Sequence, residues 1–333
     1  MNDFIKGMTE KAGKCPCMIG FPESDNVDIL KTAQQCIVTG IGTPLFIGNE
    51  KEIVLLAKEN HIITDGFQYF DNKDEDNRKK LATEYTEKFE DFSEKSVIRK
   101  SKDNLCCALF LLKLGKVGCV AGGKDYSTGD VVFHTISIVG LQDGVESASS
   151  LGIADIPGFE GPEGNMLAIA DCAITAAPDA KDLAGIAIAS ADTVKTLMDW
   201  EPRVAMLAFS TCGSAEHESI DVVREAVTLV HEMRPDIKCD GEFQLDSAII
   251  PKVATKKVPR VSDVAGKANI LIFPNLHAGN IGVKLIQIFG HANAYGPVLQ
   301  GFKLPVCDFS RSAPVDEMLG NVAMLVIRAA SMK

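Results

Sequence analysis

Short apolar runs alternate with longer amphipathic stretches along the first part of the chain. Residues 17–22 and 43–48 are mostly apolar and contain Pro and Gly, which predicts strands that end in turns. Residues 26–38 and 51–59 carry apolar positions at helical spacing and predict helices. This repeated order of strand and helix favours a mainly parallel sheet with helices on both faces.

The alternation continues along the rest of the chain, with a change of composition near residue 146. Residues 152–164 are rich in Gly and Pro and predict a loop, whereas residues 73–104 are highly charged and predict solvated helices. The other expected elements are an apolar helix at 105–114, a strand at 117–122, a strand at 166–170, a helix at 179–200, a strand at 204–209, a helix at 216–233, a strand and loop from 239, a strand at 270–274 and a helix at 282–289.

Length and charge restrict the class of protein. The 333 residues suffice for two α/β domains. The net charge of -11 argues against a nucleic acid partner, because phosphate backbones attract basic surfaces. No apolar run reaches the roughly 18 to 20 residues of a membrane helix, and the first residues lack the apolar core of a signal peptide. We therefore expect a cytoplasmic protein with no membrane partner.

The ten cysteines predict free thiols rather than disulfides or a metal site. Cys15 and Cys17 are too close together, and too isolated from further ligands, for a zinc site that usually takes four. Others, such as Cys119 and Cys172, lie in apolar surroundings, where a cysteine behaves as a small hydrophobe. We expect reduced thiols and no metal.

Two polar segments of the second half have the composition of sites. Residues 210–215 (STCGSA) lie between a strand and a helix, where hydroxyls and backbone N–H groups suit an anion, although Ser and Thr are also ordinary helix caps. Residues 239–248 (CDGEFQLDSA) hold three acids close together, which fits a metal site, an acid–base pair or a capped turn. The residues alone leave these alternatives open.

Two further segments follow strands near the C-terminal end. Residues 269–282 run from a buried strand into a polar, Gly-rich turn that opens a helix, and ligands bind at such carboxyl ends of strands. His277 in this turn is either a ligand contact or an exposed loop residue. In residues 301–311 (GFKLPVCDFSR), Ser310 offers a hydrogen bond and Arg311 a planar cation for phosphate. The chain has no G-x-S-x-G elbow, so we expect Ser310 to orient or stabilise rather than attack.

Taken together and in this order, these segments resemble the phosphate acetyl/butyryltransferase (phosphotransacetylase) family. The blocks NLHAGNIGVK and GPVLQG are specific, and DGEFQLD is more similar to the acetyl branch than to the butyryl branch. The matching blocks are IADCAITAAPDAKDLAGIAIASADTVKTL (169–197), AMLAFSTCGSA (205–215), DGEFQLDSA (240–248), ANILIFPNLHAGNIGVKLIQ (268–287) and AYGPVLQGFKLPVCDFSR (294–311).

The resemblance implies an α/β fold of two three-layer α/β domains with a cleft between them, similar to isocitrate and isopropylmalate dehydrogenases. We expect the first α/β domain at residues 1–146 plus 297–333 and the second at residues 147–296. The resemblance also implies a homodimer.

The resemblance further implies an enzyme that moves an acetyl or other short acyl group between acyl phosphate and coenzyme A. The CoA thiolate attacks the acyl carbonyl directly in a ternary complex, with coenzyme A, acyl phosphate and inorganic phosphate as partners and no prosthetic cofactor. The implied catalytic residues are Ser310 and Arg311 of the Ser-Arg motif, and Glu317, with Asp316 beside it, as the base for the thiol. The substrate-binding residues that we expect are Ser127, Thr128, Phe133, His134, Cys172, Ser210, Thr211, Asn275, His277, Gly279 and Asn280.

Several cationic positions of the family are missing. Where the pattern S-T-x-D of the family leads to arginine and proline, this chain has Phe133 and His134, and Ile288 stands at another arginine position. The helix around residues 87–88 also lacks the expected arginine, and Ser312 replaces the glycine after the Ser-Arg motif.

These departures leave three hypotheses. In the first, the protein is an active transferase in which Phe133 and Ile288 favour a less polar acyl chain, and His134 or Lys124 supplies part of the missing charge. In the second, an altered or inactive family member acts as a CoA-binding or assembly subunit. In the third, the protein is a related enzyme of the isocitrate-dehydrogenase-like group, such as an acyl-carrier phosphate acyltransferase or a metal-dependent dehydrogenase. Asp240, Glu242 and Asp246 would then be metal ligands, although no adequate G-x-G-x-x-G fingerprint follows the first strand.

Overall fold

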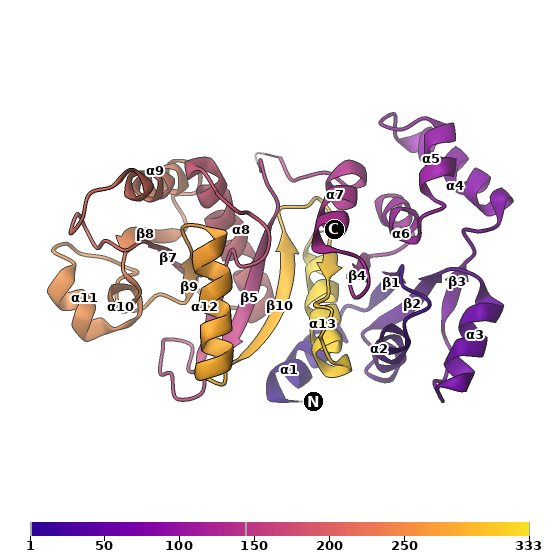
Figure 1. The fold of residues 1–333 in the computed structure, drawn as a ribbon, viewed down its shortest axis with the longest axis horizontal. Coiled ribbons are helices and arrows are strands. Elements are labelled where there is room, and N and C mark those ends of the chain that lie inside the picture. Colours follow the sequence, from indigo (N-terminus) through magenta and orange to yellow (C-terminus); the bar gives the residue numbers. More distant parts are fainter. Residues whose placement is uncertain (1, 144, 333) are drawn as a thin grey trace. The chain divides into compact units, whose positions relative to one another are not determined.

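The structure, a computed structural model, describes residues 2–143 and 145–332. The chain forms two compact units, which are described one at a time: unit 1 runs up to residue 140 and resumes at 302, and unit 2 spans residues 141–301. Both units are mixed α/β, as predicted from the alternation of strands and helices (Figure 1). Within the described residues, no helix has the length and apolar character needed to cross a membrane.

Unit 1 has a parallel sheet with the strand order β3-β2-β1-β4-β11. Its strands are β1 (Cys17–Phe21), β2 (Gly42–Ile47), β3 (Gln68–Phe70), β4 (Cys119–Gly122) and β11 (Val306–Asp308). Its helices are α1 (Asp3–Ala12), α2 (Val27–Val38), α3 (Glu50–Glu59), α4 (Glu75–Lys88), α5 (Glu94–Lys100), α6 (Asn104–Lys113), α7 (Thr128–Ile138) and α13 (Val315–Ser331).

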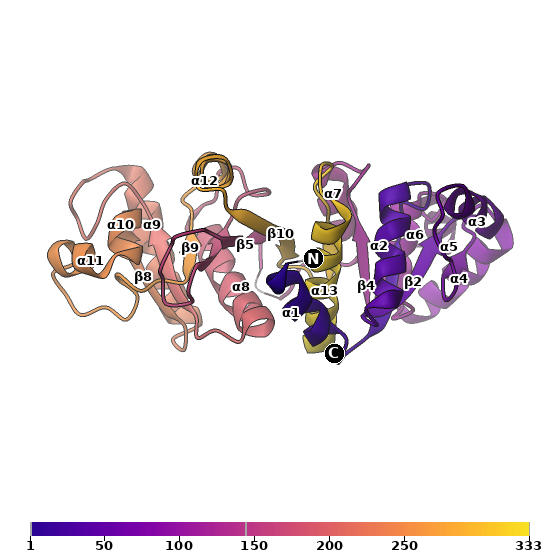
Figure 2. The same cartoon turned by 90° about the horizontal axis from the view of Figure 1, so that it is seen from below.

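Helices cover both faces of the unit 1 sheet. α2 and α13 pack together on one face with α1 beside α13, while α6 and α7 pack together on the other (Figure 2). Every residue from 318 to 329 of α13 is buried, which fits a helix that is apolar on nearly all sides. Asn26, Asp103 and Ser127 begin α2, α6 and α7 by accepting backbone N–H groups with their side chains, so local caps fix where these helices start.

Unit 2 has the strand order β10-β5-β6-β9-β7-β8, in which β6, β9, β7 and β8 are parallel and β5 is antiparallel to β6 and β10. Its strands are β5 (Ser149–Asp155), β6 (Met166–Ala170), β7 (Arg203–Leu207), β8 (Lys238–Phe243), β9 (Ile270–Ile272) and β10 (Asn293–Gln300). Its helices are α8 (Ala180–Met198), α9 (Glu218–Met233), α10 (Leu245–Ile249), α11 (Pro251–Lys257) and α12 (Leu276–Phe289).

The helices of unit 2 form layers against its sheet. α8 packs against the central strands and α9 against β7 and β8, while α12 lies on the opposite side from α8 and contacts β10 (Figure 2). The long helix α8 begins with a capping box, in which Asp179 and Asp182 bond each other's backbone N–H groups. The expected loop at residues 152–164 is wrong in its first part, because β5 continues to Asp155 by pairing with β6 and β10.

Candidate active site

The carboxyl ends of β1, β4 and β11 lie at one edge of the unit 1 sheet. β4 is parallel to both neighbours, and Asp308, the last residue of β11, lies opposite Gly122, the last residue of β4. The polar segments that follow β1, β4 and β11 contain Glu23, Lys124 and Ser310, respectively. Because ligands bind at this edge of open parallel sheets, these segments form the candidate site of unit 1.

A buried carboxylate fixes the loop between β4 and α7. Glu23 is 3% exposed. Its carboxylate accepts hydrogen bonds from the backbone N–H groups of Lys124, Asp125 and Tyr126 at 3.1, 2.6 and 3.0 Å. Burial raises the pKa of Glu23, although these hydrogen bonds act in the opposite direction. The anchored loop leads into Ser127, which caps α7.

Thr128, the first residue of α7, is bonded to the end of β11. Its hydroxyl donates to Asp308 Oδ2 at 2.6 Å. Asp308 is 4% exposed, and among the residues that the structure describes its Oδ1 atom has no hydrogen-bond partner. Burial is the main cause that raises the pKa of Asp308 to about 6, against the lowering effect of the Thr128 hydroxyl. This contact joins the two sequence segments that carry Ser127 and Ser310.

Ser310 and Arg311 follow in an exposed turn. Ser310 Oγ lies 3.2 Å from Ser312 Oγ, and the backbone N–H of Ala313 donates to the carbonyl of Ser310 at 2.9 Å. The turn therefore presents a hydroxyl and a guanidinium side by side in the sequence, a combination suited to an anion such as phosphate.

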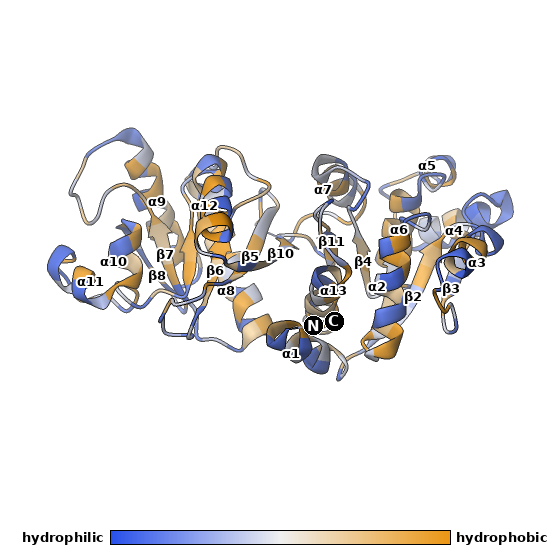
Figure 3. Ribbon diagram, turned by 60° about the horizontal axis from the view of Figure 1, so that its bottom comes forward, coloured by the Kyte–Doolittle hydropathy of each residue, from blue (hydrophilic) through white to orange (hydrophobic). Residues whose placement is uncertain are grey.

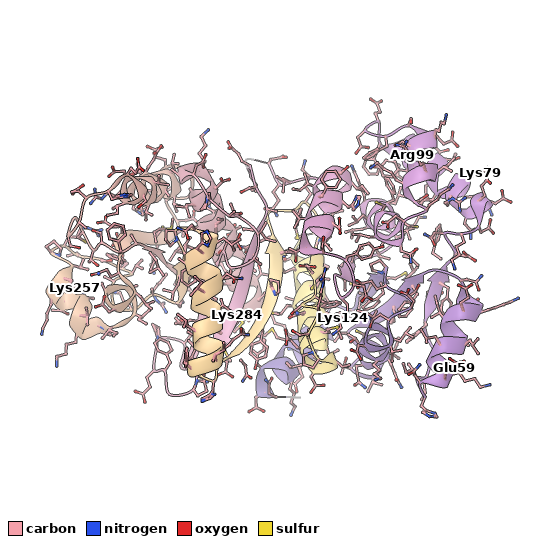
Figure 4. All side chains as sticks on the ribbon, in the orientation of Figure 1. Glu59, Lys79, Arg99, Lys124, Lys257 and Lys284 are labelled. Atoms are coloured by element: carbon pink, nitrogen blue, oxygen red, sulfur yellow. The ribbon has the colours of Figure 1, made fainter. Side chains whose placement is uncertain are left out.

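Lys124 braces this turn from the β4 side. Its Nζ atom donates to the carbonyl oxygen of Ala313 at 2.6 Å and lies 3.7 Å from Asp28 Oδ2. The Lys124 side chain is 10% exposed, and Figure 4 labels it beside α13. Because the ammonium already has these partners, the structure does not favour the expectation that Lys124 replaces a missing substrate-binding arginine.

The two candidate bases, Asp316 and Glu317, lie in the first turn of α13. Asp316 is exposed and Glu317 is half-buried. Both acids lie in the same unit as the Ser310–Arg311 turn and follow it closely in the sequence.

Phe133 and His134 lie on α7. Phe133 is 65% exposed, whereas His134 Nδ1 lies 3.4 Å from Cys106 Sγ. Burial raises the pKa of Cys106 to about 12, so Cys106 is a neutral thiol at neutral pH. The Cys106–His134 contact therefore positions the imidazole and does not form an activated nucleophile.

In unit 2, a buried acid organises the loop that carries Cys172. Asp171 is 3% exposed and accepts a hydrogen bond from the Ser150 hydroxyl at 2.5 Å. The backbone N–H groups of Ala173 and Thr175 also donate to Asp171, at 2.9 and 2.7 Å. Cys172 itself is half-buried, and burial raises its pKa, which makes it an uncharged thiol suited to contact rather than attack.

The start of α12 differs from the expected polar turn. Asn275 caps the helix by accepting the backbone N–H of Ala278 at 3.0 Å, so α12 begins at Leu276 and includes most of the predicted turn. His277 is therefore an exposed residue of the first helical turn rather than of a loop. The prediction of a turn was wrong because it rested on the Gly-rich composition, and these glycines allow close packing of a helix instead.

Gly279 and Asn280 bring α12 against the Cys172 loop. A Cβ atom at Gly279 would collide with the backbone carbonyl oxygen of Asp171, so the close approach of helix and loop requires glycine. Asn280 Nδ2 donates to the carbonyl of Cys172 at 3.2 Å. Three of the predicted binding residues of unit 2 are thus in one cluster.

The expected anion site at residues 210–215 is occupied by a carboxylate of the protein. α9 begins at Glu218, so this segment is not a helix N-terminus, and that part of the expectation is wrong. The Ser210 hydroxyl and the Gly213 N–H donate to Glu242 Oε1 at 2.9 and 2.8 Å. Thr211 is buried, and its hydroxyl donates to Ser247 Oγ in α10 and accepts the backbone N–H of Gln244, which precedes α10.

The three acids of residues 240–246 each have a cationic partner. These charges are neutralised within unit 2, which argues against the hypothesis that the acids bind a metal. Among the residues described, no group of three or more His, Cys, Asp or Glu side chains has the arrangement of a metal site. The pairs are Asp240 with Arg260 at 2.6 Å, Glu242 with Arg224 at 3.1 Å and Asp246 with Lys257 at 2.8 Å.

The sequence reasoning missed three buried acids that organise both clusters, namely Glu23, Asp308 and Asp171. Each lies at or just after the carboxyl end of a strand. That position was the available signal, because an acid directly following an apolar run seldom stays buried without a structural or chemical reason.

Comparison with known proteins assigns the chain to a family. The sequence model of the family described as phosphate acetyl/butaryl transferase matches residues 3–326. A phosphate acetyltransferase from Thermoanaerobacterium thermosaccharolyticum is 37% identical over 327 residues, which cover 98% of this chain and 99% of that protein. The chain belongs to the phosphate acetyl/butaryl transferase family and is an enzyme.

Solved structures agree with this assignment. A phosphotransacetylase from Streptococcus pyogenes superposes with a TM-score of 0.89 at 29% identity, covering 99% of this chain and 100% of that one. A 4-hydroxythreonine-4-phosphate dehydrogenase from Klebsiella pneumoniae has a TM-score of 0.50 at 11% identity, covering 94% of this chain and 100% of that one. The second likeness concerns the fold alone and agrees with the predicted dehydrogenase-like architecture.

Proposed function

We propose that this protein is a phosphate acyltransferase that moves an acetyl or other short acyl group between acyl phosphate and coenzyme A. The observation that carries the proposal is the contact of Thr128 with Asp308, which joins the Ser127 segment to the Ser310–Arg311 turn. A transferase for acyl phosphates needs hydroxyl donors and a guanidinium close together, for the reacting carbonyl and for the phosphate.

In the proposed reaction the sulfur of the CoA thiolate attacks the acyl carbonyl carbon, and the bond from that carbon to the phosphate oxygen breaks. Glu317, or Asp316 beside it, takes the thiol proton, since a thiol of pKa about 8.5 is mostly protonated at neutral pH. Ser310 donates to the carbonyl oxygen as it gains negative charge, and Arg311 binds the leaving phosphate with both arms of its guanidinium. Coenzyme A is a substrate, and the proposal requires no prosthetic group.

We assign the unit 2 cluster to substrate binding. His277 and Asn280 are exposed polar residues in the first turns of α12, next to the Cys172 loop that Asp171 fixes. Ser210 and Thr211 support the loop after β7 through their bonds to β8 and the residues that follow it. Acyl phosphates and CoA are metabolites of the cytoplasm, where we expect the enzyme to act.

One exposed apolar residue of unit 1 bears on the acyl chain. Phe133 is 65% exposed, at a position where the family resemblance implies arginine. An apolar side chain near the substrate favours a longer acyl group, because each buried CH₂ contributes about 0.8 kcal/mol. We therefore propose that propionyl and butyryl phosphates are used alongside acetyl phosphate.

The outer face of α12 supports a homodimer. Ile281, Leu285, Ile288 and Phe289 are 57%, 49%, 63% and 75% exposed and follow one another at helical spacing. Figure 3 shows apolar colouring along this helix. A stripe of this kind is more typical of an interface than of a solvated surface. Light scattering on the purified protein tests this part: twice the monomer mass supports it, and a monomer that persists at high concentration contradicts it.

The test of the function is direct. Purified protein is mixed with CoA and with acetyl, propionyl or butyryl phosphate in turn, and formation of the thioester is followed by its absorbance. We expect turnover with at least one acyl phosphate, abolished when CoA is omitted. Absence of turnover with all three, together with CoA binding in a calorimeter, would instead favour the binding-subunit hypothesis.

A further inference from the structure

We propose that Asp308 is a positioning residue for acyl transfer, holding Thr128 and the start of α7 in fixed register with the Ser310–Arg311 turn. The inference rests on the proposed function. It concerns a residue that does not reach the substrate itself, since Asp308 is 4% exposed and acts through the Thr128 hydroxyl.

The carboxylate of Asp308 is seated by the backbone of β4. The N–H of Phe309 donates to the carbonyl of Gly122 at 2.7 Å, which continues the ladder one residue beyond β11. Gly123 has φ +104°, and a Cβ atom there would collide with Asp308 Oδ1. Glycine at 123 thus leaves room for the carboxylate, and the carboxylate in turn is fixed against a rigid strand end.

A second hydrogen bond joins the segment after β4 to the segment after β11. Lys124 Nζ donates to the carbonyl of Ala313, on the far side of the Ser310–Arg311 turn from Asp308. The bonds of Thr128 to Asp308 and of Lys124 to Ala313 therefore tie both ends of the exposed turn to the segment that runs from the loop after β4 into the first residue of α7. Catalytic groups need to stay within a fraction of an ångström of their productive positions, and supports of this kind provide that.

The surroundings of Asp308 destabilise its carboxylate, which is not expected for a residue whose role is only structural. In the described part of the chain, Asp308 Oδ1 is buried with no hydrogen-bond partner. The charged groups that act on Asp308 are Glu23, from the segment after β1, and Arg311, from its own turn. A buried carboxylate with one hydroxyl partner and a nearby acid costs stability, and such groups are typical of functional sites.

The ionised carboxylate also sets the direction of the Thr128 hydroxyl. A carboxylate accepts hydrogen bonds and does not donate, so the Thr128 hydrogen is directed to Asp308 and the oxygen lone pairs face elsewhere. When Asp308 is protonated, the hydroxyl is released from this orientation. A positioning role therefore predicts a change of turnover where Asp308 titrates, whereas a purely structural role does not.

The experiment compares kcat and KM for CoA and acyl phosphate in four single variants of the full chain and in the double variant Thr128→Val/Asp308→Asn. Thr128→Val removes the bond, Thr128→Ser keeps it, and Asp308→Asn keeps an acceptor but removes the charge. The matched control is Thr135→Val on the same helix, whose hydroxyl bonds only the carbonyl of Val131 among the described residues. The denaturation midpoint of each variant is measured alongside.

We expect Thr128→Val and Asp308→Asn to lower kcat about tenfold or more, with KM for CoA changed less than about threefold. Thr128→Ser should recover most of the kcat that Thr128→Val loses, and Thr135→Val should stay within about threefold of the wild type in kcat. The wild-type pH profile of kcat should show a step near pH 6 that Asp308→Asn lacks. The double variant should lose little more kcat than Asp308→Asn alone, since both substitutions act on the same contact between Thr128 and Asp308.

Two outcomes overturn the inference and are distinct. If the wild type turns over while folded Asp308→Asn keeps its kcat and its pH profile, the positioning role is wrong and the proposed function stands. If the wild type shows no acyl transfer, both fall. Should Thr128→Val fail to fold, Thr128→Ser and Asp308→Asn still decide the matter.

Discussion

Glu242 in unit 2 and Asp308 in unit 1 are both buried acids at the carboxyl ends of parallel strands, yet their surroundings are opposite. Glu242 is 3% exposed and accepts hydrogen bonds from Arg224, Gly213 and Ser210. Burial acts to raise its pKa, but the Arg224 guanidinium and the N–H donors outweigh burial and lower it to about 2. The pKa of Asp308 is raised to about 6.

The difference separates two uses of a buried charge. Glu242 is fully partnered and holds the loop after β7 against β8, so its charge stabilises the native state. Asp308 has the Thr128 hydroxyl and, in the described residues, no partner on Oδ1, so its charge destabilises the native state. We interpret the first as structural and the second as functional.

The largest effect is expected at the exposed turn that Asp308 supports. Arg311→Gln should lower kcat/KM for acyl phosphate by about 100-fold or more, because it removes the bidentate contact to phosphate. Its denaturation midpoint should be unchanged, since Arg311 is exposed. Arg99→Gln, on the surface of α5, is the matched control and should keep wild-type kinetics. Equal kinetics of Arg311→Gln and Arg99→Gln would contradict the site.

Glu242→Gln should change stability far more than kcat. Removing one partner of this buried ion pair should lower the free energy of unfolding at pH 7 by about 3 kcal/mol. The contribution of Glu242 is present above the unfolded pKa near 4.3 and is lost as the pH falls toward its native pKa of about 2. Denaturation of both proteins between pH 7 and pH 3 checks this, and a gap that widens on acidification would be the contrary result.

Gly123→Ala tests the seating of Asp308. The positive φ and the collision of the new Cβ with Asp308 should together lower the free energy of unfolding by about 2 kcal/mol and reduce kcat. Gly115→Ala is the control, since Gly115 has φ +73° and its Cβ would meet open space. It should cost about 1 kcal/mol and keep kcat. Equal changes in stability and kcat for Gly123→Ala and Gly115→Ala would contradict the proposed seating of Asp308.

The smallest effect concerns the missing family arginine. Phe133→Arg should lower the Kd for CoA by about three- to tenfold by adding an exposed cation, and leave the denaturation midpoint unchanged. Isothermal titration with CoA at low and high salt measures it, because the gain should shrink as salt screens the charge. An unchanged affinity at low salt would show that position 133 does not face the ligand.

Much of the fold could be predicted from the sequence because local signals and tertiary structure agree in most elements. The strand–helix alternation predicted the mixed α/β fold, and caps such as Asn26 and Asp179 mark helix starts that the chain itself encodes. The prediction failed where tertiary contacts decide. β5 is a strand because β6 and β10 pair with it, and the glycines of α12 allow close packing against Asp171.

The candidate site was predictable only as a set of polar segments. Ser127, Thr128, Ser310 and Arg311 were predicted from family motifs, yet their connection through Asp308 depends on the pairing of β4 with β11, which lie far apart in the sequence. The burial that shifts the pKa of Asp308 likewise exists only in the folded chain. Residues 210–215 have the composition of an anion site, but only the folded chain shows that the Glu242 carboxylate occupies it.

The most direct test of this comparison is the free energy of unfolding of Asp308→Asn relative to the wild type at pH 4.5 and pH 7.5. Native Asp308 has a pKa of about 6 and the unfolded residue about 3.9, so the wild type loses stability as the pH rises between these values. The variant should gain about 2 kcal/mol on the wild type between the two pH values. A difference that does not depend on pH, or a loss at pH 7.5 as large as that of Glu242→Gln, would contradict the account.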